Sequence, residues 1–450
     1  MSANPRAESL PSQVNFSVLW QLAWPSILFA VLRHGYRIVD QFYAQYISVD
    51  AQAAIGSTTY FSILASGFFT IIAFGTAPLV GRAVGAGDWG KLKSIVNAAL
   101  TGVLILSVIA MLFGTTSSGL IVQGLGLTGQ TAAEAENYVF TLCLTMPPLV
   151  LAPLLDQSLI ASGDTRTPMK AHALILAMNL TLTPLFILGL DLGIIGAALS
   201  STTSTAIGGI YALSRLFKLA PFAPEIIIRP TMLRSIVRIG TPMGLGVAAY
   251  ALTYWGILAT TVSPLGPHVN AALGIGFSAL EGVTWPAFHG FSLAIASLVG
   301  RSLGAKRPDL AWVSIRKGLV IASTLGIIAS CAFYFGQWTL TGFFTEDSLV
   351  HATAATYAAI IAWSQLAVAL EAILEGVLSG AGATRAIFWA STPINLMRIP
   401  FGWYFAIKLG YGPVGLWWVL NVTTYAKVVI KGWIVQRGSW STLELESSPS

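Results

Sequence analysis

The sequence predicts an all-α polytopic membrane protein with twelve transmembrane helices in two pseudo-symmetric six-helix bundles. Charged residues make up only 9% of the 450 residues, whereas soluble proteins carry roughly 25%. Long apolar runs recur along the chain, as expected for helices that need about 20 residues to cross a bilayer. The runs are continuously apolar, which does not fit the alternating pattern of a β-barrel. Helices are then the structure that satisfies the backbone in lipid.

The chain also contains an internal repeat. Residues 79–86 read LVGRAVGA and residues 298–305 read LVGRSLGA, a shift of 219 positions. The same shift places Asp156 on Glu375 and Gly193 on Gly412. A repeat in so apolar a chain predicts two homologous membrane bundles, and transporters use such pairs to expose a central site to each side in turn.

Twelve apolar runs give the expected spans. In the first half they lie at 16–45, 53–80, 95–115, 132–160, 170–190 and 194–215. In the second half they lie at 238–262, 269–298, 317–336, 351–378, 388–408 and 413–434. Both halves start on the same side, so we expect a pseudo-two-fold axis along the membrane normal and a substrate path between the bundles.

The gaps between these runs support the boundaries and set the topology. Lys and Arg are absent from the gaps after the first, third, fifth, seventh and ninth runs, with Lys408 near the gap after the eleventh. They gather in the other gaps and after the last run, which is the positive-inside pattern. It predicts a multi-pass protein of a bacterial-type inner membrane with both termini in the cytoplasm. The basic pI then reflects topology, and no nucleic-acid partner is expected.

The expected domain organisation follows from these spans. It comprises an N-terminal tail at 1–15, a first lobe at 16–216, a cytoplasmic linker at 217–237, a second lobe at 238–437 and a C-terminal tail at 438–450. Three prolines mark the linker. The C-terminal tail is polar and is expected to be disordered.

Several segments, taken in order, resemble the multidrug and toxic compound extrusion (MATE) transporters. The first lobe carries LAWP at 22–25, VDQF at 39–42, LVGR at 79–82 with GAGD at 85–88, and SGDTRTP at 162–168. The second lobe carries RIP at 398–400 and GLWW at 415–418. Each motif alone is weak, but together they cover residues 22–431. The resemblance is closer to the DinF-like branch than to NorM.

The resemblance implies a secondary antiporter, not an enzyme. It implies export of small organic compounds, cationic or amphipathic, in exchange for H⁺ or Na⁺, by alternating access between the two lobes. No cofactor is expected, and a monomer surrounded by membrane lipid is the family expectation.

Asp40 is the leading candidate for coupling to H⁺ or a cation. It lies in the middle of the first expected span, where a carboxylate is costly unless paired, hydrated or protonated. The resemblance implies the same role for an acid in helix one. Arg33 and Arg37 share its helical face by spacing, where relatives usually have neutral residues. They could attract an anionic substrate, replace part of the ion coupling, or form a salt bridge within the first lobe.

Asn179 and Thr183 lie one turn apart in the fifth expected span, and Ser201 lies in the sixth. The resemblance to the DinF-like branch implies a coupling role for the Asn and the hydroxyl, whereas Thr183 replaces an acid. That replacement weakens any Na⁺ site near Asp40. With no NorM-type acid in residues 245–254, H⁺ is favoured over Na⁺. Ordinary interhelical hydrogen bonding is the structural alternative.

Further candidates for the substrate site are acidic and aromatic. Three of the acids, Asp156, Glu371 and Glu375, come shortly before expected cytoplasmic loops. The alternative to a substrate-binding role is that they pair with loop arginines such as Arg166 and Arg385. Arg398 is expected to pair with an acid such as Glu371. The other substrate-binding candidates are Tyr36, Arg37, Tyr138, Glu281 and Trp285.

Two alternatives stay open for the function. One is a lipid-linked precursor flippase or organic-anion exporter of the same superfamily, using Arg33 and Arg37. The other is an intramembrane enzyme or sensor, for which the sequence offers no clustered catalytic set. The segment GAGDWGK at 85–91 resembles a nucleotide-binding loop, but Leu92 stands where Ser or Thr is required. No nucleotide or structural metal is therefore expected.

Overall fold

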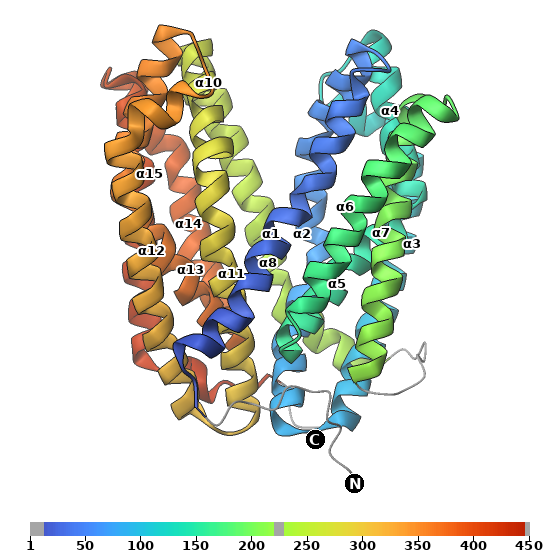
Figure 1. Cartoon of the computed structure of the whole chain (residues 1–450), viewed down its shortest axis with the longest axis vertical. Coiled ribbons are helices and arrows are strands. Elements are labelled where there is room, and N and C mark those ends of the chain that lie inside the picture. Colours follow the sequence, from blue (N-terminus) through green and yellow to red (C-terminus); the bar gives the residue numbers. More distant parts are fainter. Residues whose placement is uncertain (1–12, 220–228, 446–450) are drawn as a thin grey trace.

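The computed structural model describes residues 13–219 and 229–445, except the side chains of residues 34, 36, 37, 59–61, 63, 64, 219, 278 and 279. Helices make up nearly all of this part of the chain, and it contains no strand (Figure 1). The all-α fold predicted from composition is confirmed.

The first half consists of six helical columns, some of which are built from consecutive segments. Their bounds are α1 (Phe16–Ala44), α2 (Val49–Ala86), α3 (Trp89–Gly124), α4 (Gly129–Leu144) with α5 (Met146–Ser162), α6 (Arg166–Pro184) with the π-helical η1 (Leu185–Gly189), and α7 (Gly193–Leu219).

The second half repeats this arrangement and ends in a short 3₁₀ turn. Its bounds are α8 (Pro230–Ile257) with η2 (Leu258–Val262) and α9 (Ser263–Leu265), α10 (Pro267–Gly274) with η3 (Ile275–Leu280) and α11 (Glu281–Gly304), α12 (Pro308–Gly342), α13 (Ser348–Ala381), α14 (Thr384–Trp403) with η4 (Tyr404–Lys408), α15 (Gly412–Arg437) and η5 (Ser439–Thr442). The described segments thus form the twelve columns expected.

Hydropathy alone identifies fewer spans than the structure has columns. Within the described residues, eight helices are long and apolar enough to cross a membrane, or nine when α4 and α5 count as one span. The columns that fall short are α7, α14 and α15, which carry buried hydroxyl, guanidinium and ammonium groups. Polar side chains inside a membrane bundle are costly and tend to be functional.

The fourth expected span, 132–160, is not one straight helix. It divides into α4 and α5, which meet at a 60° bend. Two consecutive prolines, Pro147 and Pro148, occupy the first turn of α5. Proline cannot donate a backbone hydrogen bond and clashes with a preceding turn, so it starts a new helix there.

The sequence repeat is also a repeat of backbone conformation. Gly163 and Gly382, which are 219 residues apart, both end a helix in the left-handed conformation. The same shift carries the π-helical segment Leu185–Gly189 onto Tyr404–Lys408. The two halves therefore share local geometry even where their side chains differ.

The two halves meet at one end of the molecule. In Figure 1 they come together at the end where the described chain begins and finishes, and their ribbons diverge toward the opposite end. We call the end at which α2 and α11 finish the closed face. There the first turns of α1 join the core of the second half, and the first turns of α8 join the core of the first half. Each half thus packs the start of one helix into the core of the other half.

Small residues make this contact close. A Cβ atom on Gly81 would lie 3.3 Å from the Cα of Gly300, so α2 and α11 touch at two equivalent glycines of the repeat. A Cβ on Gly75 would overlap the carbonyl oxygen of Ile236 on α8. In membranes, close packing of backbones at small residues is a principal source of helix association.

The expectation of a disordered C-terminal tail is wrong for residues 438–445. Trp440 is 2% exposed, stacks at an angle on Trp312, and donates through Nε1 to the Val435 carbonyl at 2.8 Å. Leu445 packs against the core of the first half. The polar composition suggested disorder, but the two apolar side chains anchor the segment. Residues 446–450 lie outside the described part.

Candidate functional site

The carboxylate of Asp40 lies at the centre of a buried polar cluster in the first half. It is 2% exposed. Ser201 Oγ donates to Oδ2 at 2.5 Å, and Asn179 Nδ2 donates to Oδ1 at 3.2 Å. Thr183 Oγ1 lies 3.5 Å from Oδ1. The structure thus brings together the four residues predicted as the coupling site, from three helices.

Helix geometry explains this convergence. Asn179 and Thr183 are four residues apart on α6, so they share a face. Pro184 follows at the end of α6, where the helix passes into the π-helical segment η1. Thr183 also shares a hydrogen bond of 2.9 Å with Ser200 on α7, and Asn179 reaches Ser201 at 3.2 Å. These bonds fix α6 and α7 around the carboxylate.

The chemistry of the cluster is that of oxygen ligands and exchangeable protons. Hydroxyl, amide and carboxylate oxygens suit a hard cation or a water molecule. Asn179 Oδ1 is buried and has no protein hydrogen-bond partner, so one ligand oxygen remains free. A buried carboxylate among such groups is where a proton or a small cation would be held.

Arg33 lies on the part of α1 that faces the second half. It is half-buried, and its charge acts on His289 of α11 together with that of Glu375. Tyr36 and Arg37 are among the residues whose side chains lie outside the described part. Of the three residues expected on one face of this helix, the structure describes the side chains of Arg33 and Asp40.

Asp156 does not pair with the loop arginine Arg166. It lies 5% exposed within the first half, and its Oδ2 is 3.0 Å from Nε2 of His172 on α6. His172 was missed in the sequence, because a lone histidine in an apolar run gives no signal until its partner is known. Tyr138 is buried in an apolar cluster with Ile187 and Ile194.

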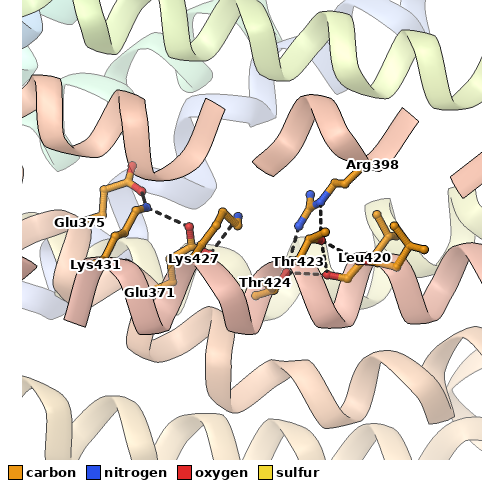
Figure 2. A network of polar contacts seen from close by, with 9 residues as sticks. Glu371, Glu375, Arg398, Leu420, Thr423, Thr424, Lys427 and Lys431 are labelled. Carbon is orange, nitrogen blue, oxygen red and sulfur yellow. Dashed lines mark hydrogen bonds and ion pairs between the residues drawn. The ribbon is translucent and has the colours of Figure 1, made fainter. Parts of the chain in front are cut away.

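A buried ionic network links α13 and α15 in the second half (Figure 2). Glu371 accepts from Lys431 at 2.9 Å and contacts Lys427 at 3.0 Å. Lys431 also donates to Glu375 at 2.6 Å and is completely buried. Their partners are therefore lysines of α15, and the alternative of pairing with loop arginines such as Arg385 is wrong. Both lysines lie in the last apolar run of the sequence, and the structure places them inside the bundle.

Arg398 does not pair with Glu371 either. Its guanidinium donates to Thr423 at 2.8 Å and to Thr424 at 3.0 Å, both on α15 (Figure 2). The spacing of the lysines offered the missed signal. Lys427 and Lys431 are four residues apart, as are Glu371 and Glu375, so two helices facing each other pair them in register.

Glu281 lies deeper in the second half. Tyr357 donates to its Oε1 at 2.5 Å, and the charge of Arg398 acts on it. Trp285, one turn further along α11, is about half exposed and stacks on His289 with ring centres 5.6 Å apart. Glu281 and Trp285 therefore have separate partners, although they share a helical face.

The second half does not reproduce the Asp40 cluster. The shift of 219 places Ala259 at the position of Asp40, Leu420 at that of Ser201, and Arg398 at that of Asn179. A fixed guanidinium thus stands where the first half has a neutral amide beside a carboxylate. The two halves are alike in backbone and opposite in local charge.

Comparisons with known proteins agree with this architecture. The MatE family model matches residues 25–185 and 242–404, one stretch in each half. The chain is 25% identical to the probable multidrug resistance protein YoeA of Bacillus subtilis, over 79% of this chain and 78% of that one. It is 26% identical to the probable multidrug resistance protein NorM of Bradyrhizobium diazoefficiens, over 83% of each. It is 22% identical to the multidrug export protein MepA of Staphylococcus aureus, over 90% of each.

Solved structures show the same fold. A Vibrio cholerae MATE transporter, VcmN in its bent form, superposes with a TM-score of 0.85 at 19% identity, covering 95% of this chain and 97% of that one. A transporter of the MOP superfamily from Pyrococcus furiosus superposes with a TM-score of 0.83 at 17% identity, covering 95% and 96%. With a family match across most of its length, the protein is a multi-pass membrane transporter that belongs to the MatE family.

Proposed function

We propose that the protein is a secondary active antiporter, which exports organic cationic or amphipathic compounds across a bacterial-type inner membrane in exchange for H⁺. One observation carries this proposal: the buried carboxylate of Asp40, held by Ser201 and Asn179 from two other helices. When the carboxylate takes up a proton it loses a charge and becomes a donor. The hydrogen bonds around it must then rearrange.

The path of α1 supports a mechanism for coupling. Its first turns pack in the core of the second half, whereas Asp40 near its other end lies against α6 and α7 of the first half. A change in hydrogen bonding at Asp40 therefore acts on a helix that touches both halves. Such a helix can bias the equilibrium between two arrangements of the halves, provided that each arrangement binds the proton and the substrate differently.

The remaining expectations belong to the same proposal. YoeA and NorM are named multidrug resistance proteins and MepA a multidrug export protein, which supports export of organic compounds. Thr183 offers a hydroxyl to Asp40 and no second carboxylate, which favours H⁺ over Na⁺. Asn179 and Ser201, which both donate to Asp40, support the likeness to the DinF-like branch. We expect a monomer without a cofactor, with the closed face and both termini in the cytoplasm.

The test uses purified protein in liposomes loaded with ethidium. We would impose a pH gradient and a Na⁺ gradient separately, and compare wild type with Asp40→Asn and with Glu346→Gln, an exposed acid in the loop before α13. We expect dye flux with the pH gradient in wild type and in Glu346→Gln, and none in Asp40→Asn. Flux driven only by Na⁺ would overturn the choice of H⁺, and equal flux in all three proteins would overturn the role of Asp40.

A second candidate function is export of organic anions or flipping of lipid-linked precursors. The observation that favours it is the buried guanidinium of Arg398 in the second half, which donates to the hydroxyls of Thr423 and Thr424. The report on the Pyrococcus furiosus relative infers a different function for that protein from the reversed polarity of its binding pocket. Gradient-driven flux of an anionic dye in place of ethidium, lost when Arg33 and Arg37 or Arg398 are changed to Gln, would establish this alternative.

A further inference from the structure

Asp156 and His172 form a second buried titratable pair in the first half, apart from the Asp40 cluster. The two side chains are 5% and 6% exposed, and Oδ2 of Asp156 lies 3.0 Å from Nε2 of His172. The other ring nitrogen, Nδ1, is buried and has no protein hydrogen-bond partner. Phe29 of α1 covers the imidazole edge-on, with ring centres 4.9 Å apart. An apolar shield with one open nitrogen suits proton transfer better than a purely structural contact.

The pair and the Asp40 cluster lie along the same two helices. His172 and Asn179 are seven residues apart on α6, which is two turns, so they share a face about 10 Å apart along the helix axis. Phe29 and Asp40 are eleven residues apart on α1, which is about three turns. The Asp40 cluster and the Asp156–His172 pair therefore lie between the same two helices, α1 and α6, at different heights along the helix axes.

Buried polar atoms occupy the space between these levels. Asn179 Oδ1 and Ser204 Oγ both lack a protein partner. Ser204 follows Ser201 by three residues on α7, and Gly208 on the same stripe lies against Ile175 of α6. In the second half, the mates of Asn179 and Ser204 touch each other, as Arg398 and Thr423. Buried polar groups without a protein partner are ordinarily bridged by water.

We propose that Asp156 and His172 form a relay that carries the coupling proton between Asp40 and the closed face, an inference that rests on the proposed H⁺ antiport. A proton leaving Asp40 passes through water at Ser204 and binds Nδ1 of His172. The Nε2 proton then moves to Oδ2 of Asp156, which releases it toward the α5–α6 loop. Rotation of the neutral ring then turns the protonated nitrogen toward Asp156 and the bare nitrogen toward the water, so each proton that enters also leaves.

The position of the pair fits this direction of transfer. Asp156 and His172 each lie six residues from the turn between α5 and α6, and the αL glycine of that turn, Gly163, lies against Arg301 at the closed face. A proton released there has about two helical turns to cover. Histidine is suited to the step because its ordinary titration range is near neutral pH.

The neighbouring helices carry the following charged and titratable groups. On α1, Arg33 lies one turn beyond Phe29, and the side chain of His34 lies outside the described part. On α11 the neighbour is Leu293, in one apolar cluster with Phe29, and His289 lies one turn away. On α6 itself Lys170 is exposed. Between Asp50 and Arg82, α2 carries no Asp, Glu, His, Lys or Arg, and α7 presents Ser204 and Gly208.

The two halves again differ at this level. The mates of Asp156 and His172 are Glu375 and Ser391, and Glu375 binds the buried ammonium of Lys431. The second half therefore has a fixed ion pair where the first half has a carboxylate and an imidazole. We place the relay in the first half only.

The test compares gradient-driven transport with exchange in liposomes, using ethidium and the full-length protein. Exchange of ethidium for ethidium needs no net proton movement, whereas transport driven by a pH gradient does. We expect His172→Gln and Asp156→Asn to lower the gradient-driven rate by about 100-fold, the range of a lost proton-transfer group, with exchange unchanged. Ser391→Ala, at the equivalent position of the second half, should behave as wild type.

Two outcomes would overturn the relay. One is wild-type gradient-driven transport in His172→Gln, and the other is an equal loss of transport and exchange, which would indicate a structural or substrate-binding role. His172→Asn is a second variant if the glutamine protein does not unfold cooperatively.

Infrared difference spectra between neutral and acid pH test the pair without any substrate. We expect one carboxyl band that is lost in Asp40→Asn, and another that is lost in Asp156→Asn and shifted in His172→Gln. Absence of the second band would overturn the relay even where the antiport stands. If wild type moves no ethidium, the proposed function fails, and a shifted second band still identifies the pair as a proton site.

Discussion

Arg82 and Arg301 occupy equivalent positions in the repeat, and each reaches the glycine-capped end of a helix in the opposite half. Arg82 on α2 donates to the carbonyl of Ala381 at 3.0 Å, just before Gly382. Arg301 on α11 lays its guanidinium against Gly163, at the end of α5. The exposed carbonyls at a helix C-terminus attract cations. The closed face is thus held by two symmetric cross-contacts.

We predict that Arg82→Ala weakens the closed face. The substitution removes hydrogen bonds from a charged group to Ala381 and Leu443, each of which contributes about 1.5–3 kcal/mol. Spin labels at Gly90 and Lys306, one in each half at this face, should show a larger share of long distances. Arg82→Lys, which keeps the charge, should show a smaller shift. An unchanged distance distribution in Arg82→Ala would show that the arginine does not hold the halves together.

We predict that Gly75→Ala destabilises the protein. The new methyl group would overlap the Ile236 carbonyl oxygen, so α2 and α8 would have to separate, at an overpacking cost of about 1–3 kcal/mol. Gly209→Ala on α7 is the control, since nothing lies within 4 Å of its Cβ position. It should be neutral or slightly stabilising because alanine favours a helix. Thermal unfolding in detergent would compare the two, and equal midpoints would contradict the close approach.

The fold and the Asp40 cluster were predicted on different grounds. The apolar runs and the repeat predicted the fold, whereas the resemblance to a known family implied that the residues around Asp40 act together. Asn179 and Thr183 could be placed on one face of a helix, and Ser201 on its neighbour. The partners of Arg398 and Asp156 could not be predicted, because they depend on how α14 meets α15 and how α5 meets α6. Several competing partners carry the same charge, and only tertiary packing chooses between them.

Two departures from expectation have a common physical cause. Lys431 carries a charge in the last apolar run, and Trp440 lies in a polar tail. Composition averaged over a window gave the first no partner inside the bundle and assigned the second to disorder. One buried ion pair or one buried indole can place a residue against the prediction from its window. The free energy of that specific contact is larger than the average tendency of the neighbouring residues to be exposed or disordered.

We predict that Lys431→Met is strongly destabilising. The change leaves Glu375 without its ammonium partner and Glu371 with Lys427 alone. Removing one partner of a fully buried ion pair costs about 3–5 kcal/mol, and we expect a loss toward the lower end because the side chain of Glu375 is 37% exposed. The double variant Lys431→Met with Glu375→Gln should recover part of this loss, since it removes the orphaned charge. Arg307→Met is the control, because its pair with Asp309 is on the surface and should contribute little. Equal unfolding midpoints for Lys431→Met and Arg307→Met would refute the buried network.

We predict that Trp440 ties the C-terminal segment to both halves. Its indole is buried beside Trp312 in the second half, while Leu445 packs on the core of the first half and Leu443 accepts from Arg82. Trp440→Ala should therefore cost about 3–5 kcal/mol, as for other buried tryptophans, and should free the residues that follow it. Limited proteolysis would detect this as faster cleavage after residue 440, with Thr442→Ala, an exposed position in the same turn, as the control. Because the segment crosses the closed face, the same variant should lengthen the Gly90–Lys306 distances. Faster cleavage without that lengthening would mean that the segment packs on the halves without holding them together.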